Sequence, residues 1–288
     1  MGVSRGGAPM LIYRSFPVFM DWLVVVILGI IEGITEFLPI SSTGHLLMAQ
    51  AFLPSLNFTA TQLEMFNVVI QSGAVLAVIV VFYDRCRELL MEWRKPEVRD
   101  YLLKLVVAFV ITGVGGIALK KLGMRLPDEA APVAWATFIG GFVILGVEYG
   151  VRNKKLKDTL SWYVVIAFGV AQLIAAAFPG ASRSGTTILL ALAMGCSRKT
   201  AVEFSFILGI PTLVSAGGLE FVGCLMEGGM DQPWGLLTVG LVVSALTAFA
   251  AVKWLLKFVQ SHNFIGFGWY RIFIGGLILG CVWGGLIK

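Results

Sequence analysis

Six long apolar stretches recur along this 288-residue chain, at about residues 65–83, 102–121, 132–150, 203–224, 236–256 and 268–287. Each is long enough to cross a bilayer as a helix, which takes about 20 apolar residues for a hydrocarbon core about 30 Å thick. Hydrophobic residues make up 58% of the chain and charged residues only 14%, which excludes an ordinary soluble domain. The sequence therefore predicts an all-α polytopic membrane protein with six transmembrane helices in a lipid bilayer.

Two further apolar regions, residues 22–53 and 162–196, are each broken near the centre. The first break reads FLPISSTG and the second reads FPGASRSG. Proline removes a backbone donor and disfavours helix in the residue before it, so each region is predicted to form two short helices joined by irregular backbone. Such backbone is stable at membrane depth only where protein or water surrounds it, so we interpret both regions as re-entrant helical hairpins.

The two broken regions resemble each other and divide the chain into two halves. EFLPISSTGHLL in the first corresponds to AAFPGASRSGTTILL in the second. Residues 21–150 and 151–288 are thus predicted to be two repeats of one membrane domain, each with one hairpin and three spans. An odd number of crossings inverts the second repeat, so the two hairpins would meet near the midplane. Residues 1–20 are interpreted as an N-terminal extension or leader.

Basic residues cluster in the predicted loops 84–101, 151–161 and 197–202. By the positive-inside rule these loops are cytoplasmic, the first hairpin opens outward and both chain ends lie outside. The net charge of +5 is therefore explained by the basic residues of the cytoplasmic loops, and no nucleic-acid partner is predicted.

Two carboxylates precede the first break. Glu32 and Glu36 are four residues apart, so they share one helix face. In a region of low dielectric such a pair requires a bound cation, a shared proton or a basic partner. The alternative is that both side chains extend to the membrane surface.

Hydroxyl groups follow both breaks and mark the start of a helix. A half-helix that begins inside the membrane presents its N–H groups and the positive end of its dipole, which together form an anion site. Simple helix capping is the alternative, and the two roles are compatible. The predicted substrate-binding residues are Ser41, Thr43, Ser182, Ser184 and Thr187.

Ser42 and His45 are three residues apart and share a face of the predicted helix after the first break. They are therefore candidate catalytic residues. The alternative for His45 is a packing histidine.

Arg183 lies at the second break, where a guanidinium is unfavourable to the helix dipole and costly at membrane depth. It therefore needs an anion, and its fork of donors matches phosphate oxygens. A structural ion pair with Glu32 or Glu36 is the alternative. Glu148 and Arg271 lie near span ends, where extension to the membrane surface explains them.

Together these groups predict a site for a phosphorylated headgroup and a divalent cation. Mg²⁺ is bound in proteins through one or two carboxylates, and substrate phosphate and water complete its shell. Glu32 and Glu36 are thus the candidate metal ligands, with Ca²⁺ or another divalent cation as alternatives.

EGITEFLPISSTGH and PGASRSGTT, in this order, resemble the bacterial undecaprenyl pyrophosphate phosphatase family, also known as bacitracin-resistance proteins. The resemblance runs from about residue 20 to the C-terminus. It implies hydrolysis of an isoprenoid lipid pyrophosphate to the monophosphate carrier of cell-wall synthesis, in the bacterial inner membrane, with the site facing the periplasm or exterior. It also implies that Glu32 and Glu36 are metal-linked, that Ser42 and His45 are catalytic and that Arg183 binds phosphate.

Two reaction routes remain open from the sequence. In one, Ser42 attacks the terminal phosphorus, and His45 either takes the serine proton or later activates water. In the other, an activated water attacks directly and Ser42 is only a ligand. A transporter or flippase with the same inverted-repeat site is the alternative function. The sequence leaves the oligomeric state open, with a homodimer as one candidate.

Overall fold

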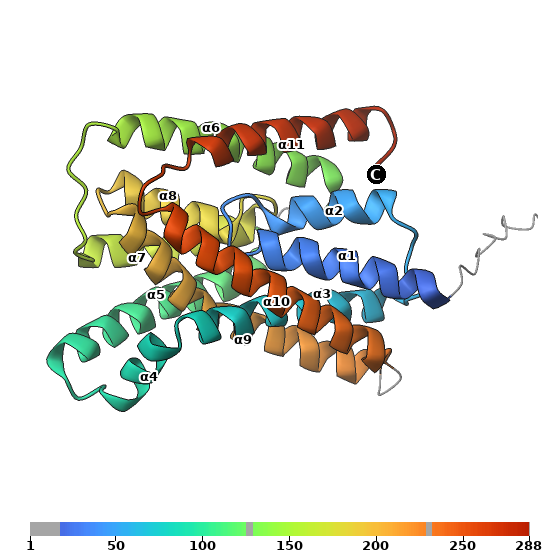
Figure 1. The fold of residues 1–288 in the computed structure, drawn as a ribbon, viewed down its shortest axis with the longest axis horizontal. Coiled ribbons are helices and arrows are strands. Elements are labelled where there is room, and N and C mark those ends of the chain that lie inside the picture. The colour runs from blue at the N-terminus through green and yellow to red at the C-terminus, as the bar shows by residue number, and fades with distance from the viewer. Residues whose placement is uncertain (1–17, 125–128, 229–231, 288) are drawn as a thin grey trace, which may run out of the picture.

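The computed structural model describes residues 18–124, 129–228 and 232–287, and helices are the regular elements of this part of the chain (Figure 1). They are α1 (Val18–Thr35), α2 (Ser42–Phe52), α3 (Ala60–Val81), α4 (Tyr83–Met91), α5 (Pro96–Lys121), α6 (Ala130–Val151), α7 (Trp162–Ala177), α8 (Arg183–Ala193), α9 (Arg198–Gly228), α10 (Trp234–Phe258) and α11 (Ile265–Trp283). Six of them, α3, α5, α6, α9, α10 and α11, are long and apolar enough to cross a membrane. The predicted all-α polytopic fold with six spans is confirmed.

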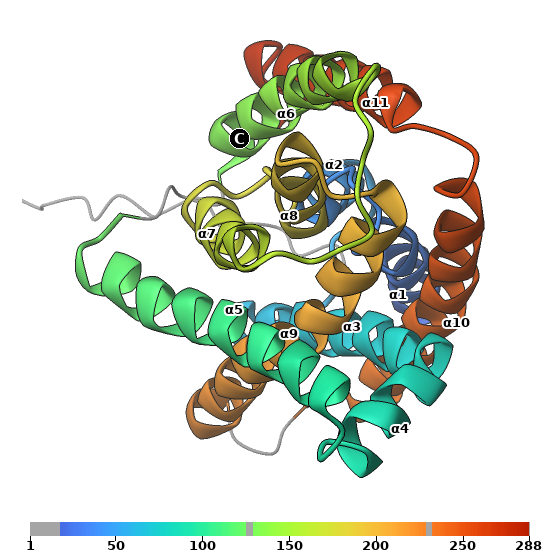
Figure 2. The ribbon, with the colours of Figure 1, turned by 90° about the vertical axis from the view of Figure 1, so that its left-hand side faces the viewer.

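Both predicted breaks are present in the structure. The first separates α1 from α2, and the second separates α7 from α8. Helices α2 and α8 have 11 residues each, so they are about 16 Å long and too short to cross a bilayer. Figure 2 shows α2 and α8 at the centre of the bundle with the other helices around them. That the hairpins re-enter the membrane stays a prediction.

Each half of the chain supplies one hairpin and three of the long helices. The packing partners correspond between the halves, since α1 packs against α10 and α7 packs against α5. Helix α3 packs against α9, and α6 packs against α11. The division into two inverted repeats stays a prediction, and the proposed N-terminal leader lies almost entirely outside the described residues.

Helix α5 exposes an apolar stripe along its length. The stripe consists of Leu103, Val106, Val110, Val114 and Ile117, which recur every three or four residues on one side of the helix. Water would disfavour such a surface, whereas lipid tails solvate it. This face of the bundle is therefore suited to a bilayer.

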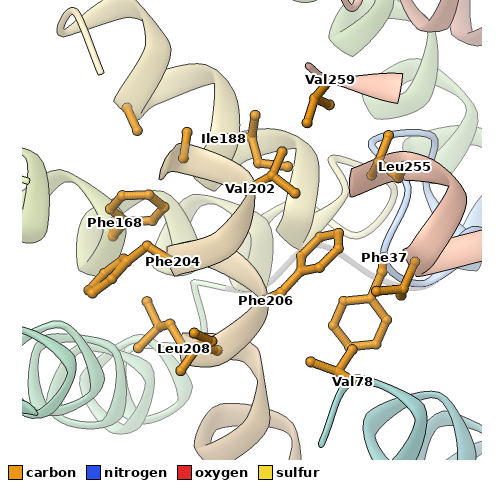
Figure 3. Close-up of a cluster of buried hydrophobic side chains, with 14 of the residues drawn as sticks. Phe37, Val78, Phe168, Ile188, Val202, Phe204, Phe206, Leu208, Leu255 and Val259 are labelled. Carbon is orange, nitrogen blue, oxygen red and sulfur yellow. The ribbon is translucent and has the colours of Figure 1, made fainter. Parts of the chain in front are cut away.

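Aromatic packing fixes the first break against α9. Phe37 is fully buried, and its ring meets that of Phe206 edge to face at a centroid distance of 5.0 Å. Figure 3 shows this contact within a cluster that also contains Phe168 and Phe204. The backbone beside Glu36 is thus held in a packed core, although it is not helical.

Candidate active site

The two short helices begin with the same unusual backbone geometry. Ser41 and Ser182 have φ angles of 74° and 70°, and they are the only non-glycine residues with positive φ in the described part of the chain. Each serine caps its helix, because the hydroxyl accepts a hydrogen bond from the amide of Gly44 or Gly185. A left-handed residue other than glycine costs about 1–3 kcal/mol and is typically found at functional sites. The predicted capping is confirmed at both breaks.

One buried carboxylate joins the two hairpins. Ser42 Oγ donates a hydrogen bond of 2.7 Å to Glu36 Oε2. Arg183 Nη2 donates to the other oxygen, Glu36 Oε1, at 3.4 Å. Glu36 lies just beyond the end of α1, whereas Ser42 starts α2 and Arg183 starts α8. The structure therefore brings together three predicted site residues from both halves of the chain.

Arg183 has donors that the protein does not fully use. Its guanidinium lies over the ring of Phe37, 5.0 Å from the centroid, and Nη1 donates to the Ser205 carbonyl at 3.3 Å. Its Nε is buried and makes no hydrogen bond to the described residues. Gly209 leaves room for this side chain, since a Cβ there would lie 2.5 Å from Nη1. The ion pair with Glu36 is thus present, but it is long and uses only one edge of the fork.

The other hydroxyl residues divide into buried and exposed ones. Ser184 is fully buried and donates to the Leu38 carbonyl at 2.9 Å, which ties α8 to the first break. Thr187 is also buried and shares a hydrogen bond of 2.7 Å with Ser205 on α9. Thr43 is exposed in the first turn of α2. Substrate binding by these residues stays a prediction, and the contacts of Ser184 and Thr187 show that both also hold the site together.

His45 contacts a tyrosine that the sequence analysis does not identify. Its Nδ1 lies 2.7 Å from the Ser41 carbonyl, and its Nε2 lies 2.7 Å from the Tyr270 hydroxyl. A carbonyl only accepts, so Nδ1 carries the proton and Nε2 accepts from Tyr270. Ser42 donates to Glu36, so in this arrangement Glu36 is the base next to Ser42. The sequence gives no signal for Tyr270, because an aromatic residue in an apolar helix resembles many others.

The predicted metal ligands fit a divalent cation in their chemistry. Glu32 is buried, and its Oε2 has no hydrogen-bond partner among the described residues. Glu32 and Glu36 are on adjacent turns, since the Glu36 amide donates to the Glu32 carbonyl at 2.9 Å. The described residues contain no cluster of three or more potential His, Cys, Asp or Glu ligands. Two carboxylates suffice for Mg²⁺ when phosphate and water supply its other ligands.

The prediction that Glu148 and Arg271 extend to the membrane surface is wrong. Glu148 is buried and accepts two hydrogen bonds from Arg198 and one from the Phe264 amide. Arg271 is only 1% exposed and donates to backbone carbonyls of other segments. A buried charge requires such partners. They come from distant parts of the chain, so position within a span does not reveal them.

Comparison with known proteins identifies the family. The family described as bacitracin resistance protein BacA matches residues 25–277. An undecaprenyl-diphosphatase of Rhizobium etli (strain CIAT 652) is 46% identical over 270 residues, which cover 93% of this chain and 100% of that protein. Its counterpart from Xylella fastidiosa (strain 9a5c) is 44% identical over 261 residues, which cover 90% of this chain and 98% of that protein. Since these matches include both breaks, the chain belongs to the bacitracin resistance protein BacA family.

Proposed function

We propose that this protein hydrolyses undecaprenyl pyrophosphate to undecaprenyl phosphate and inorganic phosphate, and so regenerates the lipid carrier for cell-wall synthesis. The observation that carries the proposal is the contact of Glu36 with both Ser42 and Arg183, where two helix N-termini meet. Phosphoryl transfer depends on positioning and on neutralising the charge of the non-bridging oxygens. The relatives from R. etli and X. fastidiosa share the name undecaprenyl-diphosphatase, which supports the choice of substrate.

In the first step, Ser42 Oγ attacks the terminal phosphorus. Glu36 Oε2, 2.7 Å away, takes the hydroxyl proton. The bond between the terminal phosphorus and the bridging oxygen breaks, and the lipid monophosphate leaves. Arg183 and the first amides of α2 and α8 donate to the phosphate oxygens, where charge accumulates.

In the second step, water attacks the phosphoserine and releases phosphate. We assign the activation of this water to His45, because Nε2 is its unprotonated ring nitrogen. The attacking water would take the place of the Tyr270 hydroxyl, which Nε2 accepts from in this structure. Histidine suits this role, since it exchanges a proton near neutral pH. Direct attack by water, with Ser42 only as a ligand, is the competing route.

A divalent cation, Mg²⁺ or Ca²⁺, would be held by Glu32 and Glu36. It would supply positive charge to the pyrophosphate oxygens. The unpartnered Oε2 of Glu32 supports this assignment, because a buried carboxylate oxygen without a donor is costly.

The function is tested by phosphate release from undecaprenyl or farnesyl pyrophosphate, using the purified protein in detergent. We expect turnover that EDTA abolishes and added Mg²⁺ restores. A protein that only transports the lipid would release no phosphate, and this outcome would reject the proposed hydrolysis. Full activity in EDTA would instead reject only the metal.

We further propose that the protein resides in the bacterial plasma membrane with its site facing outward. Single cysteines replacing Asn57 and Asn153, both exposed asparagines in loops, provide a matched test in a cysteine-free background. An impermeant maleimide added to intact cells should label Asn57→Cys and leave Asn153→Cys unlabelled until the cells are opened. The reverse pattern would overturn the orientation.

Substitution of Arg183 should impair turnover more than stability. Lysine keeps the charge but loses the planar fork, so Arg183→Lys should lower kcat by about 10-fold to 100-fold and Arg183→Ala by about 30-fold to 1000-fold. The measurements are phosphate release and melting temperature on the same preparation.

Arg198→Lys is the matched control, because Arg198 also pairs with a buried glutamate, Glu148, outside the site. This control should lower the melting temperature and leave kcat of the folded protein unchanged. If Arg183→Lys behaves in the same way, Arg183 is a structural partner of Glu36 and not a phosphate ligand.

A further inference from the structure

Among the described residues, Arg271 on α11 is the most deeply buried charged side chain that the proposed reaction steps do not use. It is 1% exposed, and its guanidinium donates five hydrogen bonds of 2.9–3.4 Å. All five acceptors are backbone carbonyls, those of Pro39, Ala136, Thr137, Gly180 and Ala181. A guanidinium has five N–H donors, so each donor has an acceptor.

These carbonyls belong to three segments that are far apart in the sequence. Pro39 is in the first break, two residues before the cap Ser41. Ala181 is in the second break, directly before the cap Ser182. The other segment is α6, which packs along α11. One rigid, planar group therefore connects the starts of α2 and α8 to the surrounding helices.

The charge of Arg271 has no carboxylate partner among the described residues, since all five of its hydrogen bonds go to backbone carbonyls. Carbonyl dipoles stabilise a guanidinium but leave its net charge in place. At the meeting point of the two helix N-termini, that charge adds to a potential that already favours an anion.

Gly140 on α6 provides the space for the guanidinium. A Cβ at this position would lie 2.2 Å from Arg271 Nη2, and its three nearest contacts would all be guanidinium atoms. Gly146, on the same helix, would meet nothing within 4 Å. The two glycines thus differ in whether an added methyl group would displace Arg271.

We propose that Arg271 is a positioning residue for phosphoryl transfer. It fixes the starts of α2 and α8 relative to each other, so that Ser42 and Arg183 contact the same phosphate group. The proposal rests on the proposed hydrolysis. Orientation of reacting groups is a large part of catalysis, and a displacement of about 1 Å can cost about 100-fold in rate.

The test compares Arg271→Lys and Gly140→Ala with the matched control Gly146→Ala. Lysine has three donors on a flexible chain and cannot hold five carbonyls in a plane. We expect kcat to fall by about 10-fold to 100-fold in Arg271→Lys and by a smaller factor in Gly140→Ala, with KM changed less than threefold. Gly146→Ala should retain wild-type kcat and KM.

A second measurement does not depend on hydrolysis. Nitroxide labels on cysteines replacing Phe52 and Met194, exposed residues near the ends of α2 and α8, report the distance between the two half-helices when the four native cysteines are removed. Arg271→Lys and Gly140→Ala should broaden or shift this distance distribution, and Gly146→Ala should not. If the wild-type protein releases no phosphate, the proposed function fails, and the label distances still decide whether Arg271 positions the helices.

Three outcomes would overturn the proposal. One is wild-type kcat in the folded Arg271→Lys and Gly140→Ala variants. Another is an unchanged distance distribution in both. The third is loss of the folded protein in both variants, which would make Arg271 a structural anchor only.

Discussion

Replacement of Ser42 by alanine should lower phosphate release by about a thousandfold to a millionfold, because the substitution removes the proposed nucleophile. The fold should persist, since Ser42 is only partly buried and its hydroxyl makes one side-chain contact, with Glu36. That carboxylate oxygen would lose its donor, at a cost of about 1–3 kcal/mol in stability. Phosphate release and melting temperature measured on one preparation separate the two effects.

Ser72→Ala is the matched control for this substitution. The Ser72 hydroxyl donates to the Val68 carbonyl of its own helix, so its removal should leave kcat unchanged. Near-normal turnover by Ser42→Ala would contradict the nucleophile assignment and favour direct attack by water.

A slow His45→Gln variant should, in contrast, accumulate phosphate on Ser42, which mass spectrometry of the intact protein detects.

The second large effect is expected for Glu36→Gln. Glutamine preserves the size of the side chain but cannot take the Ser42 proton or carry the charge that faces Arg183. Loss of a general base typically costs about 100-fold to 10,000-fold in rate, so kcat should fall by this factor. If the Glu36 carboxylate also binds the metal ion, the residual activity of Glu36→Gln should need a higher Mg²⁺ concentration than the wild type to reach half of its maximum.

Glu148→Gln is the matched control for Glu36→Gln, because it shows whether the loss of a buried carboxylate is by itself enough to lower kcat. Glu148 is also a buried glutamate paired with an arginine, and Arg198 and the Phe264 amide are its partners. Its substitution should destabilise the protein while kcat of the folded fraction stays at the wild-type value. A Glu36→Gln variant with normal kcat and a lowered melting temperature would show that Glu36 is structural.

The fold could be predicted from local sequence because each element carries its own signal. Apolar length gave the six spans. Pro39 and Pro179 marked the two breaks, and the serines after them marked the starts of α2 and α8. In each case the physical cause acts within a few residues: proline lacks a donor, and a serine hydroxyl caps the amide three residues ahead.

The interior of the site could not be predicted in the same way. Arg271 and Glu148 lie near span ends in the sequence, but their partners are distant in the chain. Arg271 donates to carbonyls of other segments, and Glu148 pairs with an arginine 50 residues away. Nothing near them in the sequence encodes those contacts. The approach of Glu36 to Ser42 likewise depends on how the chain turns between α1 and α2, which the packing of Phe37 against Phe206 fixes.

The contact between Glu36 and Arg183 has a consequence for biosynthesis. The two residues are 147 positions apart, so the glutamate leaves the ribosome long before its arginine is made. A ribosome adds about 5–20 residues per second, so this interval lasts about 7–30 seconds. During that time the first hairpin holds two acidic groups without their cationic partner, and insertion into lipid would be costly. The nascent chain must therefore keep this segment protonated, hydrated or shielded by the insertion machinery until the second half of the protein arrives.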